Sequence, residues 1–109
     1  MTIHPWLIFI AAALLEVAGD ATIRRGLRGG GISLILGGFV ILGSYGLLVN
    51  TVRWDFSRLL GVYIAFFALA SVLFGRYALR DVVSRSTWVG LALIICGGLV
   101  IQFGHRIKP

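Results

Sequence analysis

Glu16 and Asp20 are the residues whose type and position most clearly predict chemistry in this chain. Both acids lie in the first long apolar run, and Glu16 is the twelfth residue of that run. At 1.5 Å per residue in a helix, Glu16 would lie about 18 Å from the start, near the middle of a bilayer core of about 30 Å. An ionised carboxylate costs at least about 2.5–3.5 kcal/mol at that depth. Because burial disfavours the charged form, we expect Glu16 to exchange a proton near physiological pH, or to hold a cation when ionised.

Each acid also has a structural alternative. Glu16 could stay protonated and donate a hydrogen bond to a neighbouring helix. Asp20 follows four residues later on the same helix face, about 6 Å nearer the next loop. Two acids this close in a low dielectric resist double ionisation. Asp20 therefore either joins Glu16 in a binding site or pairs with Arg24, which lies four residues further on.

Three other polar residues in the apolar runs complete the predicted proton- and substrate-binding set. Tyr63, near the start of the third run, could contact an organic cation through its ring; an interfacial tyrosine is the alternative. Ser44 and Asn50 lie in the second run. No motif for nucleotide, zinc or covalent nucleophile chemistry is present, so we predict no enzyme activity, no cofactor and no metal site.

Four apolar runs must position these residues, at about 5–23, 31–52, 59–79 and 87–104. Each approaches the 20 or so residues that a helix needs to cross a bilayer. The chain is 59% apolar and 13% charged, against about 45–50% and 25% in soluble domains. These values exclude a soluble enzyme and a disordered chain. We predict an all-α membrane protein, a single domain over residues 1–109, in which short loops make neighbouring helices antiparallel.

The charged residues favour a bilayer as partner and argue against nucleic acid. The net charge is +6, but nearly all the basic residues lie between apolar runs, where they suit lipid headgroups. No nucleic-acid-binding motif appears. The three tryptophans, Trp6, Trp54 and Trp88, fall near the ends of runs, as expected for a membrane interface. The chain has one cysteine, Cys96, so an intrachain disulfide is excluded.

Membrane orientation is weakly specified, which suggests a dimer. One predicted face holds four basic residues (Arg53, Arg58, Arg106 and Lys108), and the other holds five (Arg24, Arg25, Arg28, Arg80 and Arg85), or six with Arg76. With basic residues so evenly divided between the two faces, the chain could insert into the membrane in both orientations and form an antiparallel homodimer. A single fixed orientation is the alternative. Gly90, Gly97 and Gly98 on the fourth run are the predicted dimer-packing residues, and intrachain packing is their alternative.

Three stretches of the chain share a common pattern with one known family: LLEVAGDATIR at 14–24, SYGLLVNTV at 44–52 and GLALIICGGLVI at 90–101. Together they resemble the small multidrug resistance family of the drug/metabolite transporter superfamily. The resemblance implies an antiparallel dual-topology dimer with alternating access across the inner membrane. It implies that Glu16 of both subunits binds protons or a cationic substrate in competition, with Tyr63 as the nearby aromatic. Asp20 and the absent glycine kink in the third helix depart from the family pattern and fit a neighbouring branch of the superfamily.

The predicted function is proton-coupled export of small hydrophobic or guanidinium-like cations across the cell inner membrane. Two alternatives stay open. The chain could be a transporter or flippase of a polar lipid or small metabolite, with its arginine loops engaging phosphate headgroups. It could also be a membrane assembly subunit that transports nothing.

Overall fold

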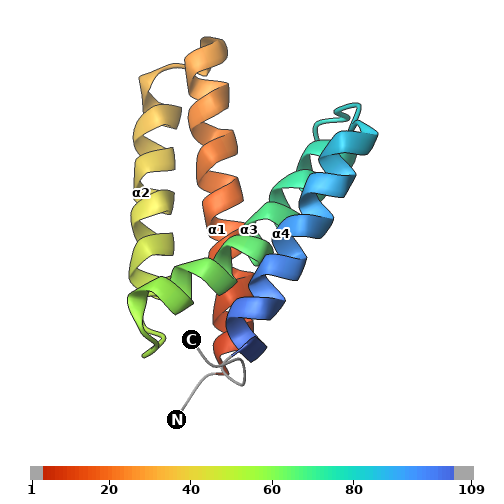
Figure 1. The fold of residues 1–109 in the computed structure, drawn as a ribbon. Helices are drawn as coiled ribbons and strands as arrows, with labels where there is room; N and C mark the ends of the chain where they lie inside the picture. Colours follow the sequence, from red (N-terminus) through yellow and green to blue (C-terminus); the bar gives the residue numbers. More distant parts are fainter. Residues whose placement is uncertain (1–3, 105–109) are drawn as a thin grey trace. The chain divides into compact units, whose positions relative to one another are not determined.

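The structure, a computed structural model, describes residues 4–104 as helices joined by short connections (Figure 1). Helix α1 spans Pro5–Arg25 and continues through a π-helical turn, η1 (Gly26–Gly30), toward α2 (Ile32–Val49). Helices α3 (Phe56–Tyr77) and α4 (Arg85–Phe103) follow. Within residues 4–104, four helices are long and apolar enough to cross a membrane, and no strand is formed. The predicted all-α fold with four membrane-spanning helices is confirmed.

Contacts divide the chain into two compact units, Met1–Arg53 and Trp54–Pro109. The first contains α1 and α2, and the second contains α3 and α4. Two basic residues that the sequence counts toward membrane orientation, Arg106 and Lys108, lie outside the described residues. The single four-helix domain over residues 1–109 stays a prediction, and each helix pair is described by itself below.

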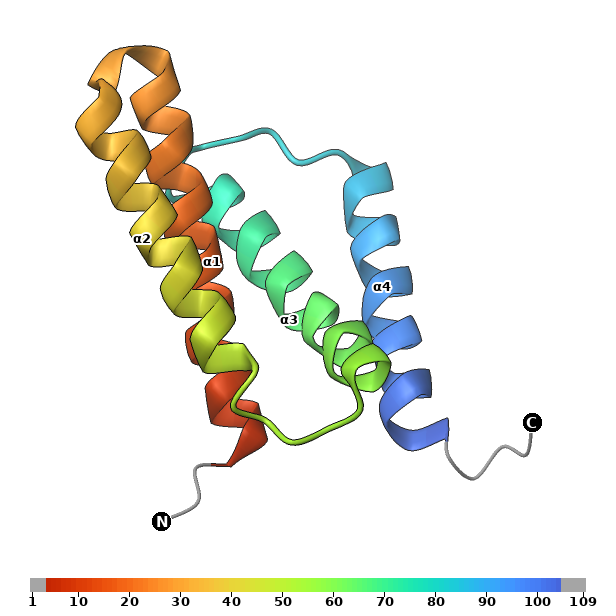
Figure 2. The ribbon, with the colours of Figure 1, turned by 90° about the vertical axis from the view of Figure 1, so that its left-hand side faces the viewer.

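The first unit is a hairpin in which α1 and α2 run side by side (Figure 2). At the start of α1, the Trp6 backbone N–H donates to Nδ1 of His4 at 3.2 Å, which satisfies one of the unpaired helix-start donors. The chain reverses at Gly29, inside η1, and at Gly31, which follows it; their φ angles are 108° and 97°. Glycine adopts such angles without steric cost, so this turn depends on its glycines.

Helix α2 ends at Val49, three residues before the end that hydropathy predicts. The side-chain amide of Asn50 donates to the carbonyl of Gly46 at 2.8 Å, and the Thr51 hydroxyl donates to the carbonyl of Leu48 at 2.6 Å. Side chains that bond to the local backbone in this way compete with the regular helical pattern. The apolar run therefore extends beyond the helix itself.

The second unit is a hairpin of α3 and α4 (Figure 2), in which the first half of α3 contacts the second half of α4. A Cβ built on Gly61 would lie 2.7 Å from Cδ1 of Ile101, and one on Gly98 would lie 3.0 Å from Cβ of Ala65. Both glycines thus permit close approach of the helices. Helix α4 begins at Arg85 because the Ser84 hydroxyl accepts from the Thr87 backbone N–H at 3.2 Å, as an N-cap residue does.

Large apolar side chains remain exposed along the helices, as a lipid environment requires. Leu14 of α1, Leu47 of α2 and Leu93 of α4 are examples. A water-soluble protein rarely exposes extended apolar surface, whereas lipid-facing helices need it. The tryptophans lie near helix ends, as predicted: Trp6 and Trp88 in first turns, and Trp54 two residues before α3.

Candidate functional site

Helix α1 places Glu16, Gly19 and Asp20 on one face, because residues three and four apart are neighbours on a helix. Gly19 is buried, Glu16 is half-buried and Asp20 is exposed. The two carboxylates therefore lie one turn apart, at different depths relative to the packed surface of α1.

Glycines bring α2 against this face of α1. A Cβ built on Gly19 would lie 2.7 Å from Cγ of Leu42 and 3.2 Å from the carbonyl oxygen of Gly38. A Cβ on Gly38 would meet the Ile23 side chain and lie 2.9 Å from the carbonyl oxygen of Gly19. The two backbones therefore touch at this level, immediately next to the acidic residues.

Tyr45 of α2 joins the two acids. It lies seven residues after Gly38 and three after Leu42, so it shares the face of α2 that packs on α1. Since the helices are antiparallel, the turn before Gly19 on α1 faces the turn after Leu42 on α2. Tyr45 is half-buried and lies within electrostatic range of both Glu16 and Asp20.

Tyr45 is absent from the residues that the sequence predicts for this site. The sequence feature that could have identified Tyr45 is its helical spacing from Gly38 and Leu42, which places the three residues on one helix face. That spacing becomes informative only when Gly38 is known to contact Gly19, because the sequence alone does not fix the register of the hairpin.

The alternative partner predicted for Asp20 does not engage it. In the part of the chain that the structure describes, no ion pair joins Asp20 to Arg24. Asp20 is exposed and within electrostatic range of Tyr45, and its part in a binding site stays a prediction.

Ser44 and Asn50 have local backbone partners. The Ser44 hydroxyl donates to the carbonyl of Val40 at 2.9 Å. Ser44 and Asn50 are both exposed. Asn50 lies five residues beyond Tyr45, which is about 7.5 Å further along the chain at helical rise. The structure therefore brings neither side chain into the group formed by Glu16, Asp20 and Tyr45, and their roles in binding stay predictions.

Tyr63 belongs to the second unit, on α3, where it is 2% exposed. Such burial differs from that of an interfacial tyrosine, whose hydroxyl end is usually wet. Its predicted contact with a bound cation stays a prediction.

The predicted dimer-packing glycines fall into two groups. Gly98 faces Ala65 of α3 in the same chain, whereas a Cβ built on Gly90 or Gly97 would meet nothing within 4 Å. Gly98 therefore has an intrachain packing role, and Gly90 and Gly97 remain open for contact on the surface of α4.

The arrangement in the first unit suits a cation or protons. Two carboxylates can neutralise a positive charge, and the phenol ring of Tyr45 offers a cation–π surface. Among residues 4–104 no group of three His, Cys, Asp or Glu side chains could hold a metal ion.

Comparison with known proteins now places the chain in a family. Residues 2–107 match the family model described as "Uncharacterised BCR, YnfA/UPF0060 family". The chain belongs to this family. Because the matching model is that of YnfA/UPF0060, the narrower resemblance to small multidrug resistance proteins stays a prediction.

Relatives in the YnfA/UPF0060 family match over nearly their whole length. A UPF0060 membrane protein of Mycobacterium marinum is 32% identical over 109 residues, covering 97% of this chain and 98% of the relative. One of Staphylococcus aureus is 32% identical over 106 residues, covering 95% and 98%. One of Synechocystis is 28% identical over 107 residues, covering 97% and 99%. No solved structure matches the chain. The names of these relatives, together with the four apolar helices, identify this chain as a membrane protein.

Proposed function

We propose that this YnfA/UPF0060 protein is a proton-coupled antiporter that exports small hydrophobic or guanidinium-like cations across the inner membrane. The observation that carries the proposal is the position of Glu16, which is half-buried midway along α1, one turn from Asp20 and within electrostatic range of Tyr45. A carboxyl group at this depth is costly unless its charge is used, so a functional role is the first expectation for it.

Coupling follows from the shared use of one carboxyl group. Deprotonated Glu16 binds the cation, with Asp20 adding negative potential and Tyr45 a ring face. Protonation of Glu16 removes its attraction for the cation and releases it. Because each ligand weakens the binding of the other, a proton gradient can drive export when the site opens to one side at a time.

We further propose that two copies of the chain assemble, in opposite orientations, to enclose the path. Four helices provide few side chains to line a path, and a dimer supplies eight. The open Gly90 and Gly97 of α4 offer a surface for close helix contact. The near balance of basic residues between the two predicted faces favours insertion in both orientations.

Proton release tests the proposal directly. Purified protein in weakly buffered detergent solution is mixed with tetraphenylphosphonium or a phenylguanidinium salt, and the released protons are followed with a pH indicator. We expect wild-type protein to release protons on binding, and Glu16→Gln to release none and to bind the cation independently of pH.

Asp81→Asn is the matched control, because it removes a carboxylate outside the helices. It should release protons as the wild type does. Cation binding that stays pH-dependent in Glu16→Gln would contradict the proposal.

A further inference from the structure

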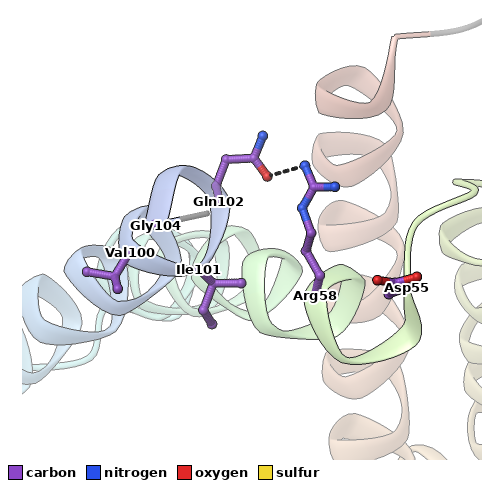
Figure 3. A pocket seen from close by; sticks show the side chains of 6 residues that line it. All are labelled: Asp55, Arg58, Val100, Ile101, Gln102 and Gly104. Carbon is purple, nitrogen blue, oxygen red and sulfur yellow. Dashed lines mark hydrogen bonds between the residues drawn. The ribbon is translucent and has the colours of Figure 1, made fainter. Parts of the chain in front are cut away.

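A separate cavity of about 710 Å³ lies in the second unit, where α3 begins and α4 ends (Figure 3). The level of these helix ends corresponds to the membrane interface of a spanning hairpin. The described residues that line it all belong to the second unit. The residues that line it are Asp55, Arg58, Val100, Ile101, Gln102 and Gly104.

Arg58 is held in place from two sides. One of its terminal nitrogens, Nη2, donates to Oε1 of Gln102 at 3.0 Å, and its Cζ lies 4.0 Å from the centroid of a Trp54 ring. A guanidinium has five N–H donors, and the bond to Gln102 uses one of them. The half-buried Arg58 thus presents further donors in a fixed orientation, which is the arrangement that binds phosphate oxygens well.

A residue of opposite charge, Asp55, lines the same cavity. Asp55 precedes Arg58 by three residues and makes no capping hydrogen bond to α3. Figure 3 shows Asp55 on the other side of Arg58 from Gln102. A ligand that carries a phosphate alone would meet repulsion from Asp55, whereas a ligand that also carries an ammonium group would satisfy both charges.

Two apolar side chains, Val100 and Ile101, complete the lining. They suit the glycerol and first acyl carbons of a lipid, since apolar surface at the interface continues into the hydrocarbon layer. Trp54, which holds Arg58, is of the residue type that prefers the headgroup level.

We propose that this cavity binds the headgroup of an ethanolamine phospholipid. The phosphate accepts hydrogen bonds from Arg58, the ammonium donates to Asp55, and Val100 and Ile101 contact the carbons below. Phosphatidylglycerol lacks the ammonium group. The quaternary ammonium of phosphatidylcholine cannot donate a hydrogen bond to a carboxylate. Both should therefore bind more weakly.

Native mass spectrometry of the purified full chain in detergent tests this assignment. The protein is titrated with phosphatidylethanolamine, phosphatidylglycerol or phosphatidylcholine of identical acyl chains, and with soluble glycerophosphoethanolamine. We expect one phosphatidylethanolamine to be retained, with about tenfold weaker binding in Arg58→Ala, because bonds to a charged group are lost. Asp55→Asn should abolish the preference for phosphatidylethanolamine over phosphatidylglycerol while keeping phospholipid binding.

Matched controls are Arg85→Ala and Asp81→Asn, which remove the same charges outside the cavity and should leave retention unchanged. If Arg58→Ala fails to fold, Arg58→Lys, which keeps the charge and loses the planar fork, should still weaken binding. Equal affinity of the wild type for phosphatidylethanolamine and phosphatidylglycerol, or unchanged retention in the Arg58 variants, would overturn the proposal. Binding of glycerophosphoethanolamine as tight as that of the lipid would assign the cavity to a soluble phosphate ester instead.

Discussion

Gly19 of α1 and Gly38 of α2 bring their helix backbones into contact, so that a Cβ on Gly38 would lie 2.9 Å from the carbonyl oxygen of Gly19. Small residues allow such approach in lipid, where packing and polar contacts hold helices together. Glu16 lies one turn before Gly19 on α1, and Tyr45 lies two turns after Gly38 on the same face of α2. The glycine pair therefore sets the register that brings the carboxyl group and the phenol together.

Gly38→Ala should destabilise the first unit, because the added methyl group meets the Ile23 side chain and the Gly19 carbonyl. We expect a loss of about 1–3 kcal/mol, as for other overpacked sites. Gly37→Ala is the control, since a Cβ there would meet nothing within 4 Å. It should be neutral or slightly stabilising, because alanine favours helix more than glycine does. Unfolding in mixed detergent micelles, followed by tryptophan fluorescence, measures both; equal stability of the two variants would show that the contact is not tight.

Asp20→Asn should separate the roles of the two acids. Because Asp20 is exposed, its charge should contribute about 1 kcal/mol to cation binding, so affinity at high pH should fall about fivefold. The pH dependence should persist, since Glu16 is intact. Cation binding measured by isothermal titration calorimetry at several pH values checks this. Loss of pH dependence in Asp20→Asn would move the proton-exchanging role from Glu16 to Asp20.

Tyr45→Leu should weaken binding of an aromatic or guanidinium cation by about 1–2 kcal/mol, about five- to thirtyfold, through loss of the ring face. Tyr45→Phe keeps the ring and should retain most of the affinity. Tyr63→Leu tests the aromatic residue that the sequence predicts, in the same assay. A loss on Tyr63→Leu with none on Tyr45→Leu would assign the aromatic contact to α3.

Cys96 offers a direct test of helix pairing through α4. It is the chain's one cysteine, it is exposed, and it borders Gly97. If α4 pairs with α4 of a second copy near Gly97, a short bifunctional maleimide should link two chains in membranes. Cys96→Ser is the control for the reaction. Gly97→Val should reduce the linkage, because a larger side chain separates the helices. If the Cys96 thiol is accessible to reagents but no linked dimer forms, α4 does not pair with α4 of a second copy near Gly97.

The helix boundaries illustrate what hydropathy can and cannot provide. The apolar runs locate each helix, but α3 starts at Phe56 rather than 59, because Ser57 and Arg58 fit into its first turn despite their polarity. Conversely, α2 ends before its apolar run does, because Asn50 and Thr51 bond to the preceding carbonyls. Hydropathy reports the preferred solvent of a segment, whereas hydrogen bonding decides where the helix stops.

By itself, the sequence determined the membrane class, the number of helices and the position of Glu16 midway along the first of them, because these depend on composition and on distance along one helix. The tertiary structure decided which residues of other helices face that carboxyl group. The contact of Gly19 with Gly38 fixed the register of the first hairpin and brought in Tyr45. In the second hairpin, the packing of Gly98 on Ala65 and the bond of Arg58 to Gln102 likewise depend on helix register. The register of two helices depends on how their side chains pack against each other. The residue pattern within either helix alone does not specify that packing.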